Sequence, residues 1–387
     1  ELELVTEFKV ARCLGNGSDP ETAPDRFEAS GVIATGGRAK TGLLLVLDNS
    51  RDFVEIDVGL RRCKNATARL IPTPALSPLF SSEAAAGEGG FEAITVDDTS
   101  ARLFAVEETS YELSDSFQAR VQSFSSDLQT KLSDQLLDFE FDSKNKGVEG
   151  AAIVSSGNTK YLLALCEGNG CRSGDAGKKP GGGTILVYYR ANSSNSTSWV
   201  YNDKIRLPDE LDFIDYSGLD VRLGGGGGQG RQSDRNGETD SSDGAWWDIA
   251  VVSQESSALF WGALVAETDE SKPSGVDWKV FGTTGVYKFP SGYCNIEGIA
   301  FLNNAEESSV KSGSDDLGKS TAGGEQDRND SGSDRTDATV TYFAVVSDKS
   351  KSSQPASCVA KDQSVHLFRL RSERAEIFAV GHGALLV

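Results

Sequence analysis

Carboxylate side chains recur at matching places along this chain. Glu92, Glu149 and Glu297 each open a short apolar segment, and Ser30 and Ser217 open two similar ones. Carboxyl groups that lie close together raise one another's pKa or bind a cation such as Ca²⁺. Such a group could therefore hold calcium or supply a general acid and a general base.

A second set of acidic residues follows the next apolar run of each repeat. This set comprises Asp48, Glu107 or Glu108, Glu167, Glu255 and Asp348. The candidate metal ligands are Glu92, Glu149, Glu297, Asp48 and Glu167, with calcium as the candidate cofactor, and no residue is singled out as catalytic. The alternative is that these carboxylates accept backbone N–H groups at turns between strands, as acidic side chains often do.

The elements that must position these carboxylates form an internal repeat. A Ser or Glu is followed by Gly or Ala and then by an apolar run, as in Glu297-Gly298-Ile299-Ala300, and this signature occurs five times. Successive signatures start roughly 60 to 80 residues apart, a period that suits four-stranded propeller blades with long loops. The inner segments read as continuous apolar runs, which is typical of strands packed on both faces.

The repeat predicts an all-β fold, a β-propeller with five blades, or six if a degenerate blade is hidden in the flanking segments. We expect residues 1–387 to form one propeller domain, with the N-terminal strand in residues 1–13 helping to close the ring. The predicted modules are residues 26–85, 86–145, 146–210, 211–290 and 291–387, all approximate. Long Gly/Ser/Asp-rich inserts occupy residues 224–244 and 304–337. A pair of β-sandwiches is the alternative, and residues 127–137 show helical spacing, which predicts a short helix or a decorated loop in the second module.

The six cysteines and five glycosylation sequons point to an oxidising compartment. An even number of cysteines fits three disulfides, and proximity within modules favours Cys13–Cys63, Cys166–Cys171 and Cys294–Cys358, although sequence alone leaves the pairing open. The sequons are at Asn16, Asn65, Asn192, Asn195 and Asn329. We therefore expect a secreted glycoprotein.

The charge balance restricts the partners. The net charge is −20, so the chain should repel nucleic acid and anionic membrane surfaces. No apolar run reaches the length of about 18 residues that a membrane span needs. The expected partner is an extracellular protein or glycan, and the chain could be part of a larger assembly.

Familiar catalytic motifs are missing or misplaced. Residues 313–320 read as a phosphate-binding loop, but acidic and Ser-rich sequence surrounds them where a strand and a helix are required. There is no Gly-x-Ser-x-Gly motif. The two histidines, His366 and His382, offer no distinct catalytic triad.

The strand openings Glu28-Ala29-Ser30-Gly31, Glu149-Gly150 and Glu297-Gly298 resemble those of secreted propellers of the phytase-like esterase group and of related bacterial propellers. The resemblance implies the fold and no particular activity. We therefore expect a non-catalytic extracellular module for adhesion, assembly or ligand binding. The alternative is a secreted metal-dependent phosphoesterase or esterase that uses the acidic site at the mouth of the propeller channel.

Overall fold

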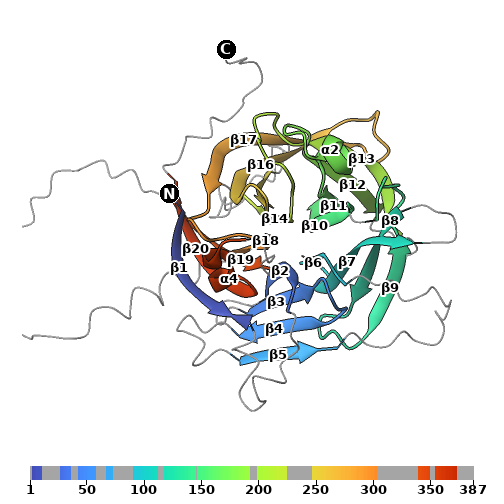
Figure 1. Ribbon diagram of the computed structural model, residues 1–387. Coiled ribbons are helices and arrows are strands. Elements are labelled where there is room, and N and C mark those ends of the chain that lie inside the picture. The colour runs from blue at the N-terminus through green and yellow to red at the C-terminus, as the bar shows by residue number, and fades with distance from the viewer. Residues whose placement is uncertain are drawn as a thin grey trace, which may run out of the picture.

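The protein is a five-bladed β-propeller, shown here as a computed structural model (Figure 1). The structure describes residues 2–10, 27–35, 42–57, 67–72, 90–111, 117–144, 146–191, 198–224, 246–302, 339–348 and 354–372. These residues form five four-stranded antiparallel sheets arranged in a ring. The prediction of five blades is confirmed, and neither a sixth blade nor a pair of sandwiches is present in the described part of the chain.

Blades 1 to 3 follow the chain from the inside of the ring to the outside. Blade 1 consists of β2 (Ala29–Thr35), β3 (Gly42–Leu47), β4 (Phe53–Asp57) and β5 (Thr67–Ile71). Blade 2 consists of β6 (Ala93–Asp97), β7 (Arg102–Tyr111), β8 (Phe117–Phe124) and β9 (Lys131–Leu136). Blade 3 consists of β10 (Val148–Ser156), β11 (Thr159–Cys166), β12 (Thr184–Ala191) and β13 (Val200–Arg206).

Blades 4 and 5 complete the ring. Blade 4 consists of β14 (Gly218–Leu223), β15 (Trp246–Ser253), β16 (Ala258–Thr268) and β17 (Val276–Lys288). Blade 5 consists of β18 (Ile296–Leu302), β19 (Thr339–Ser347), β20 (Ser364–Ser372) and the N-terminal strand β1 (Leu2–Lys9). Short helices η2 (Asn169–Cys171) and α2 (Gly174–Gly177) follow β11, and α4 (Ala356–Lys361) precedes β20. No described helix has the length and apolarity needed to cross a membrane.

The two ends of the described chain meet in blade 5. Strand β1 pairs antiparallel with β20, so residues from the start and the end of the sequence lie side by side (Figure 1). Arg369 forms two hydrogen bonds with the Glu3 carboxylate, at 2.6 and 2.7 Å, and Lys9 pairs with Asp362 at 2.5 Å. This pairing covers the outer edge of β20.

That residues 1–387 form a single domain with the module limits given above remains a prediction.

His366 lies in the interior of blade 5 and is fully buried. Its Nε2 lies 3.0 Å from Ser347 Oγ, and its Nδ1 lies 3.5 Å from the Glu7 carboxylate. Burial lowers the pKa of His366 to about 4, so the imidazole is neutral near pH 7. Ser347 is also fully buried, so this serine–histidine pair joins β19 to β20 and offers no nucleophile to a substrate.

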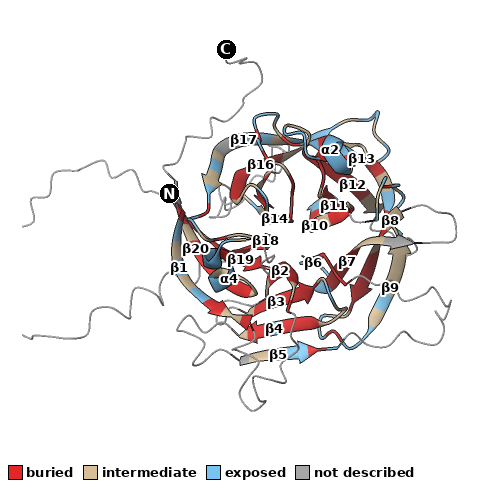
Figure 2. Ribbon diagram, viewed as in Figure 1, coloured by how far each residue is buried: buried red, intermediate tan, exposed pale blue. Residues whose placement is uncertain are grey.

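The hydrophobic core lies between neighbouring blades (Figure 2). Phe53, Phe91 and Phe124 pack together between blades 1 and 2, with ring centroids 5.3–6.2 Å apart. Between blades 3 and 4, the Trp278 ring lies 5.0 Å from Tyr161 and 5.1 Å from Trp247. Because both faces of each inner strand are covered, those strands are apolar along most of their length.

Residues 127–137 do not form the helix that their spacing indicates. They form a turn followed by β9, and Leu128 takes a positive φ of 59° within the turn. Leu128 and Leu137 are buried, whereas Leu132 is 42% exposed. The apolar spacing therefore does not mark one buried face.

The small residue of each signature lets the inner strands approach closely. A Cβ atom on Gly150 would lie 2.6 Å from the backbone nitrogen of Leu219 in blade 4. A Cβ on Gly218 would lie 2.8 Å from the Glu297 carbonyl oxygen in blade 5, and one on Gly298 would lie 3.0 Å from the Ser30 carbonyl oxygen in blade 1. At these three positions the inner strands therefore pack backbone against backbone, which glycine permits because it has no side chain; the Glu92 signature has Ala93 instead.

We predict that Gly150→Ala lowers the free energy of unfolding by about 1–3 kcal/mol, because the new methyl group would force two inner strands apart. The measurement is chemical unfolding followed by tryptophan fluorescence. Gly282→Ala in β17 is the matched control, since its Cβ would meet no atom closer than 3.8 Å. Equal stability of the Gly150→Ala and wild-type proteins would contradict close packing at this position.

Candidate active site

The opening residues of the five signatures lie at one end of the ring, where the inner strands begin. In β2, β10 and β18 the register shifts at this residue, so Ser30, Glu149 and Glu297 each occupy a β-bulge. A bulge leaves one residue unpaired and redirects its side chain. Glu92 and Ser217 precede β6 and β14 and donate their backbone N–H groups to the second strand of their own blades.

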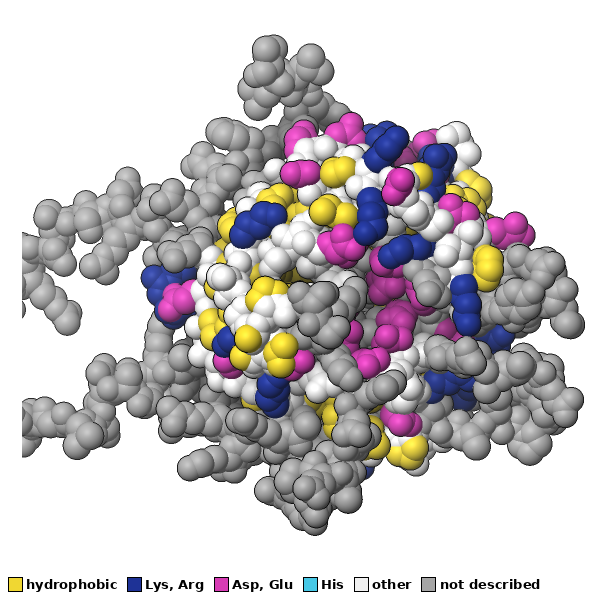
Figure 3. All heavy atoms as spheres, in the orientation of Figure 1, with side chains coloured by type: hydrophobic (Ala, Val, Ile, Leu, Met, Phe, Trp, Pro, Cys, Tyr) yellow, Lys and Arg dark blue, Asp and Glu magenta, His cyan; other side chains and the backbone are white. Residues whose placement is uncertain are grey.

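The acidic centre is the name we give to the carboxylates gathered at this end of the ring (Figure 3). Its described members are Asp48, Glu92, Glu108, Glu149, Glu167, Asp215 and Glu297. They come from blades 1 to 5 or from the segments that join them. Equivalent blade positions thus converge, as the repeat predicts.

Burial and mutual repulsion raise the pKa of the three signature glutamates well above the usual range. For Glu92, the charges of Asp48, Glu108 and Glu297 add to the effect of burial, as does a hydrogen bond with the Asp48 carboxyl. For Glu149, other acidic groups of the centre have the same effect, and for Glu297 the strongest of these charges is that of Asp348, which follows β19. These carboxyl groups therefore tend to keep their protons at pH values where exposed glutamates are ionised.

Glu108, Glu149 and Glu167 form the tightest group within the acidic centre. One oxygen from each lies within 4.8 Å of the others, and all three side chains are half-buried. The Lys146 ammonium pairs with Glu167, and the Gly147 N–H donates to Glu108 Oε1 at 2.9 Å. Burial and the nearby acidic charges raise the pKa of Glu108 to about 7.

The three glutamates have different partners, which gives them different protonation tendencies. Glu149 has only acidic groups among the causes of its raised pKa besides burial. Burial also raises the pKa of Glu167, but the hydrogen bond and positive charge of Lys146 oppose this. Glu149 therefore holds its proton more firmly than Glu167 does, because both pKa values are raised but only that of Glu167 is opposed by Lys146.

Hydrogen bonds fix the rest of the acidic centre. Gln254 Nε2 donates to Glu297 Oε1. Asp215 accepts from Ser253 Oγ at 2.6 Å and from the Glu255 N–H at 3.0 Å. Ser217 has no carboxylate to offer and donates its hydroxyl to the Ile296 carbonyl of the next blade at 2.5 Å.

The five candidate metal ligands all lie in the acidic centre, but the structure does not bring all five together. Glu149 and Glu167 belong to the tight group, whereas Glu92 is hydrogen-bonded to Asp48 and Glu297 to Gln254. Among the described residues, only the group of Glu108, Glu149 and Glu167 has three ligand atoms close enough to hold one ion.

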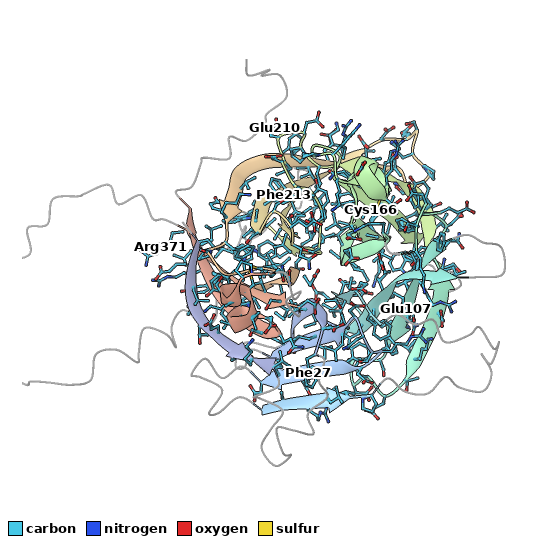
Figure 4. The ribbon with its side chains drawn as sticks, in the orientation of Figure 1. Phe27, Glu107, Cys166, Glu210, Phe213 and Arg371 are labelled. Carbon is cyan, nitrogen blue, oxygen red and sulfur yellow. A yellow bond between two sulfur atoms is a disulfide. The ribbon has the colours of Figure 1, made fainter. Side chains whose placement is uncertain are left out.

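Sequence reasoning left Glu107 and Glu108 as alternatives and missed Lys146 and Asp215. Glu108 faces the acidic centre, whereas Glu107 is buried in blade 2, where it accepts from Gln122 and pairs with Arg51 at 3.1 Å (Figure 4). Successive residues of a strand point to opposite faces, which could have separated the two. Asp215 lies two residues before Ser217, and Lys146 lies three residues before Glu149. Their closeness to a signature could have drawn attention to them, but neither belongs to a recognisable motif.

Two of the three expected cysteine pairs are disulfides in the structure. Cys166–Cys171 has a Cα–Cα distance of 5.2 Å and closes the turn that carries Glu167 (Figure 4). Cys294–Cys358 has a Cα–Cα distance of 5.3 Å and joins α4 to the segment before β18. Other predicted features lie outside the described residues. These are Cys13, Cys63, the sequons at Asn16, Asn65, Asn192, Asn195 and Asn329, the phosphate-loop string 313–320, His382 and nearly all of both inserts.

The comparisons with known proteins show likeness of fold. No protein-family model matches the sequence, and no curated protein matches it. The catalytic domain of a GH62 α-L-arabinofuranosidase from Coprinopsis cinerea aligns over 94% of this chain and 96% of its own, with a TM-score of 0.43 and 7% identity. An α-L-arabinofuranosidase from Podospora anserina in complex with cellotriose aligns over 93% and 94%, with a TM-score of 0.44 and 6% identity. A GH43_1 enzyme from Xanthomonas citri complexed with xylotriose aligns over 89% and 87%, with a TM-score of 0.43 and 7% identity.

These comparisons correct two expectations. The resemblance to phytase-like esterases holds only for the propeller fold, because the similar structures are glycoside hydrolases. The expected function, a non-catalytic module or alternatively a metal-dependent phosphoesterase or esterase, is contradicted by the same finding. The repeat predicted the architecture, whereas the absence of familiar catalytic motifs does not by itself indicate a non-catalytic protein.

The raised pKa of Glu297 predicts a pH-dependent gain in stability for Glu297→Gln. The folded protein holds the Glu297 proton more tightly than the unfolded chain does, so this group's contribution to stability falls as the pH rises. We expect Glu297→Gln to raise the free energy of unfolding by roughly 1–3 kcal/mol at about pH 8 and by much less at about pH 4.5. The amide keeps the oxygen that accepts from Gln254.

The measurement is thermal or chemical unfolding of both proteins across this pH range. The difference between them isolates Glu297 from His366, whose lowered pKa acts in the opposite direction. Glu270→Gln, at an exposed position, is the control and should behave like the wild type. A pH-independent difference for Glu297→Gln would contradict the raised pKa.

Proposed function

We propose that this chain is a glycoside hydrolase whose catalytic carboxyl groups lie in the acidic centre. The observation that carries the proposal is the pairing of Glu149, whose pKa is raised well above its usual range, with Glu167, which pairs with Lys146. Most glycoside hydrolases cleave the glycosidic bond with one carboxylic acid and one carboxylate. The two glutamates supply this pair at half-buried positions.

Glu149 acts as the general acid in this proposal. Its proton passes to the glycosidic oxygen as the bond from that oxygen to the anomeric carbon breaks. The group needs a pKa near or above the working pH, and burial together with nearby acidic charges raises it in that direction. Glu108, within the same 4.8 Å group, adds negative charge that favours the protonated form of Glu149.

Glu167 acts as the nucleophile. The oxygens that Glu149 and Glu167 offer lie within 4.8 Å of each other. Retaining enzymes place their carboxyl groups about 5–5.5 Å apart, whereas inverting enzymes leave about 6.5–9.5 Å for a water molecule. We place this pair in the retaining class, in which Glu167 attacks the anomeric carbon directly. Water, deprotonated by Glu149, then displaces Glu167, and the sugar is released with retained configuration.

We predict that Glu149→Gln and Glu167→Gln each reduce glycoside hydrolysis by about 10²- to 10⁴-fold. The measurement is release of reducing ends from a panel of neutral and acidic polysaccharides. Glu270→Gln is the control, because its side chain is exposed and lies in the turn between β16 and β17. If the wild-type protein cleaves none of the panel, or if both glutamine variants keep full activity, the proposal is wrong.

The same pair predicts a bell-shaped pH profile. Activity should fall at high pH as Glu149 loses its proton and at low pH as Glu167 gains one. Lys146→Gln should move the acidic limb to higher pH, because Lys146 favours the ionised form of Glu167. An acidic limb that stays in place would exclude Glu167 as the group that must be ionised.

Calcium remains a proposal for the same three glutamates. Carboxylate oxygens are the ligands that Ca²⁺ prefers, and three of them lie within 4.8 Å of one another. A bound ion would supply positive charge that keeps these carboxylates ionised, so calcium binding and the protonated Glu149 that hydrolysis requires are alternative states of the same site. We expect added CaCl₂ to stabilise the protein by about 2.7 kcal/mol at 100 times the dissociation constant.

The measurement is thermal unfolding with CaCl₂ and with a chelator. Glu149→Gln should lose the calcium-dependent shift, whereas Glu270→Gln should keep it. If the wild-type melting temperature is the same in both solutions, calcium does not bind here.

We also propose that the protein is secreted. The two disulfides support this, because disulfides persist mainly in oxidising compartments. A secreted protein would encounter a polysaccharide substrate outside the cell. Fractionation of the source cells tests the proposal, and a protein confined to the cytosol would contradict it.

A further inference from the structure

A basic pocket lies at the rim of blade 3. Its cavity has a volume of about 460 Å³ and is lined by Arg172, Lys179, Lys204 and Arg206, together with uncharged residues that include Asn169. This volume falls within the range of about 300–1,000 Å³ that is usual for ligand pockets. Four cationic side chains around one cavity are a marked departure for a chain of net charge −20.

Carboxylates do not neutralise this pocket. None lines the cavity among the residues that the structure describes. Arg206 pairs with Asp209 at 3.2 Å, but both side chains are at least 70% exposed, so the pair is weak. Within the same described ranges, no carboxylate lies at ion-pair distance from Arg172, Lys179 or Lys204. The charge of Lys204 acts on Asp203 without forming an ion pair, so these cations are not bound to carboxylates and can contact a ligand.

A buried amide holds the floor of the pocket in place. Asn169 is only 3% exposed, and its Nδ2 donates to the carbonyl groups of Gly177, Phe213 and Ile214 at 3.0–3.1 Å. Its Oδ1 accepts from the Gly182 N–H at 3.0 Å. These bonds join η2, α2 and the start of β12, so the loops that carry Arg172 and Lys179 have a fixed base.

The basic pocket and the acidic centre share one short segment. Glu167, the proposed nucleophile, lies two residues before Asn169, and its carbonyl accepts from the Tyr216 N–H at 2.9 Å. Two strand spacings of about 4.8 Å each separate β11, which ends beside Glu167, from β13, which carries Lys204 and Arg206. In Figure 3, Lys and Arg side chains gather over the part of the rim near α2, beside the acidic side chains at the centre.

We propose that the basic pocket binds an anionic group of the substrate, a carboxylate or a sulfate ester, and that the substrate is therefore an acidic glycan. The inference rests on the proposed glycoside hydrolase function. Arg and Lys are the side chains that best bind such oxyanions. Nucleic acid would place a phosphate on every unit and so set negative charge against the acidic centre, whereas a glycan can carry its charge only on the unit that reaches the pocket.

The positions of the two sites also predict where the charge lies on the substrate. An anionic sugar in the acidic centre would be repelled by Glu92, Glu149 and Glu297, whereas the same sugar in the basic pocket would be attracted. The charged unit should therefore lie one or a few units away from the bond that is cleaved. A glycan in which neutral and acidic units alternate fits this arrangement better than one charged at every unit.

The test is calorimetric binding of oligosaccharides of equal length that are neutral, uronate-containing or sulfated, measured on full-length protein. We expect the variant carrying both Arg172→Gln and Lys204→Gln to bind an acidic oligosaccharide at least about tenfold more weakly at low salt, and the loss to shrink at about 0.5 M salt. Binding of the neutral oligosaccharide should not change. Comparison of the uronate and sulfate ligands shows which anion the pocket takes.

Lys279→Gln is the control, because this exposed lysine of blade 4 pairs with Glu267 and lies outside the pocket. Equal melting temperatures would show that the variants fold alike. Unchanged affinity of the double variant for acidic oligosaccharides, or equal wild-type affinity for neutral and acidic ones, would overturn the inference even if the protein hydrolyses glycans. Pocket-dependent binding without hydrolysis would instead uphold the basic pocket and contradict the proposed catalysis.

Discussion

The backbone contact between inner strands is the constraint on which the rest of the structure depends. Gly150, Gly218 and Gly298 each lie so near the next blade that a Cβ atom would meet its backbone at 3.0 Å or less. Such packing narrows the ring and draws the residue before each glycine toward a common axis. Two of the residues before these glycines are Glu149 and Glu297, so the same contact that closes the propeller also crowds carboxyl groups, and Glu92 of blade 2 joins them. The raised pKa values of Glu92, Glu149 and Glu297 follow from burial and from this crowding.

Crowded carboxyl groups destabilise the fold, and other parts of the chain must offset them. The aromatic contacts between blades provide part of the compensation, since a buried Phe or Trp removes a large apolar surface from water. Closure of blade 5 by β1 and β20 prevents the ring from opening where its two ends meet. The disulfide Cys166–Cys171 holds the turn beside Glu167, and Cys294–Cys358 does the same for the segment that leads into Glu297. Stability is therefore concentrated around the blades, while the centre of the ring keeps a group of residues that is unfavourable for folding, as functional sites often do.

The sequence predicted the features that repeat and missed those that do not. Five signatures with the same residue pattern define five blades, and equivalent positions must converge at one end of a ring, so Glu92, Glu149 and Glu297 could be placed together. Repetition says nothing about Lys146, which occurs in one blade only and favours the ionised form of Glu167. It also cannot reveal the basic pocket, whose cations come from η2–α2 and β13 and meet only after folding. The helical spacing of residues 127–137 misled for a related reason, because a strand on the outer edge of a blade has no strict pattern of burial.

The acidic centre and the basic pocket have opposite charges and lie apart, so together they would orient a charged glycan. A neutral glycan would meet the acidic centre with no preference for one end of the chain. One anionic unit would fix which end of the glycan lies at the rim, because this unit is repelled at the acidic centre and attracted at the rim of blade 3. Since Asn169 joins the pocket to the segment carrying Glu167, a unit bound at the rim would set the position of the next units relative to the proposed catalytic pair. Binding energy from a remote part of the substrate would then serve to orient the bond that reacts, which is an effective use of such energy in catalysis.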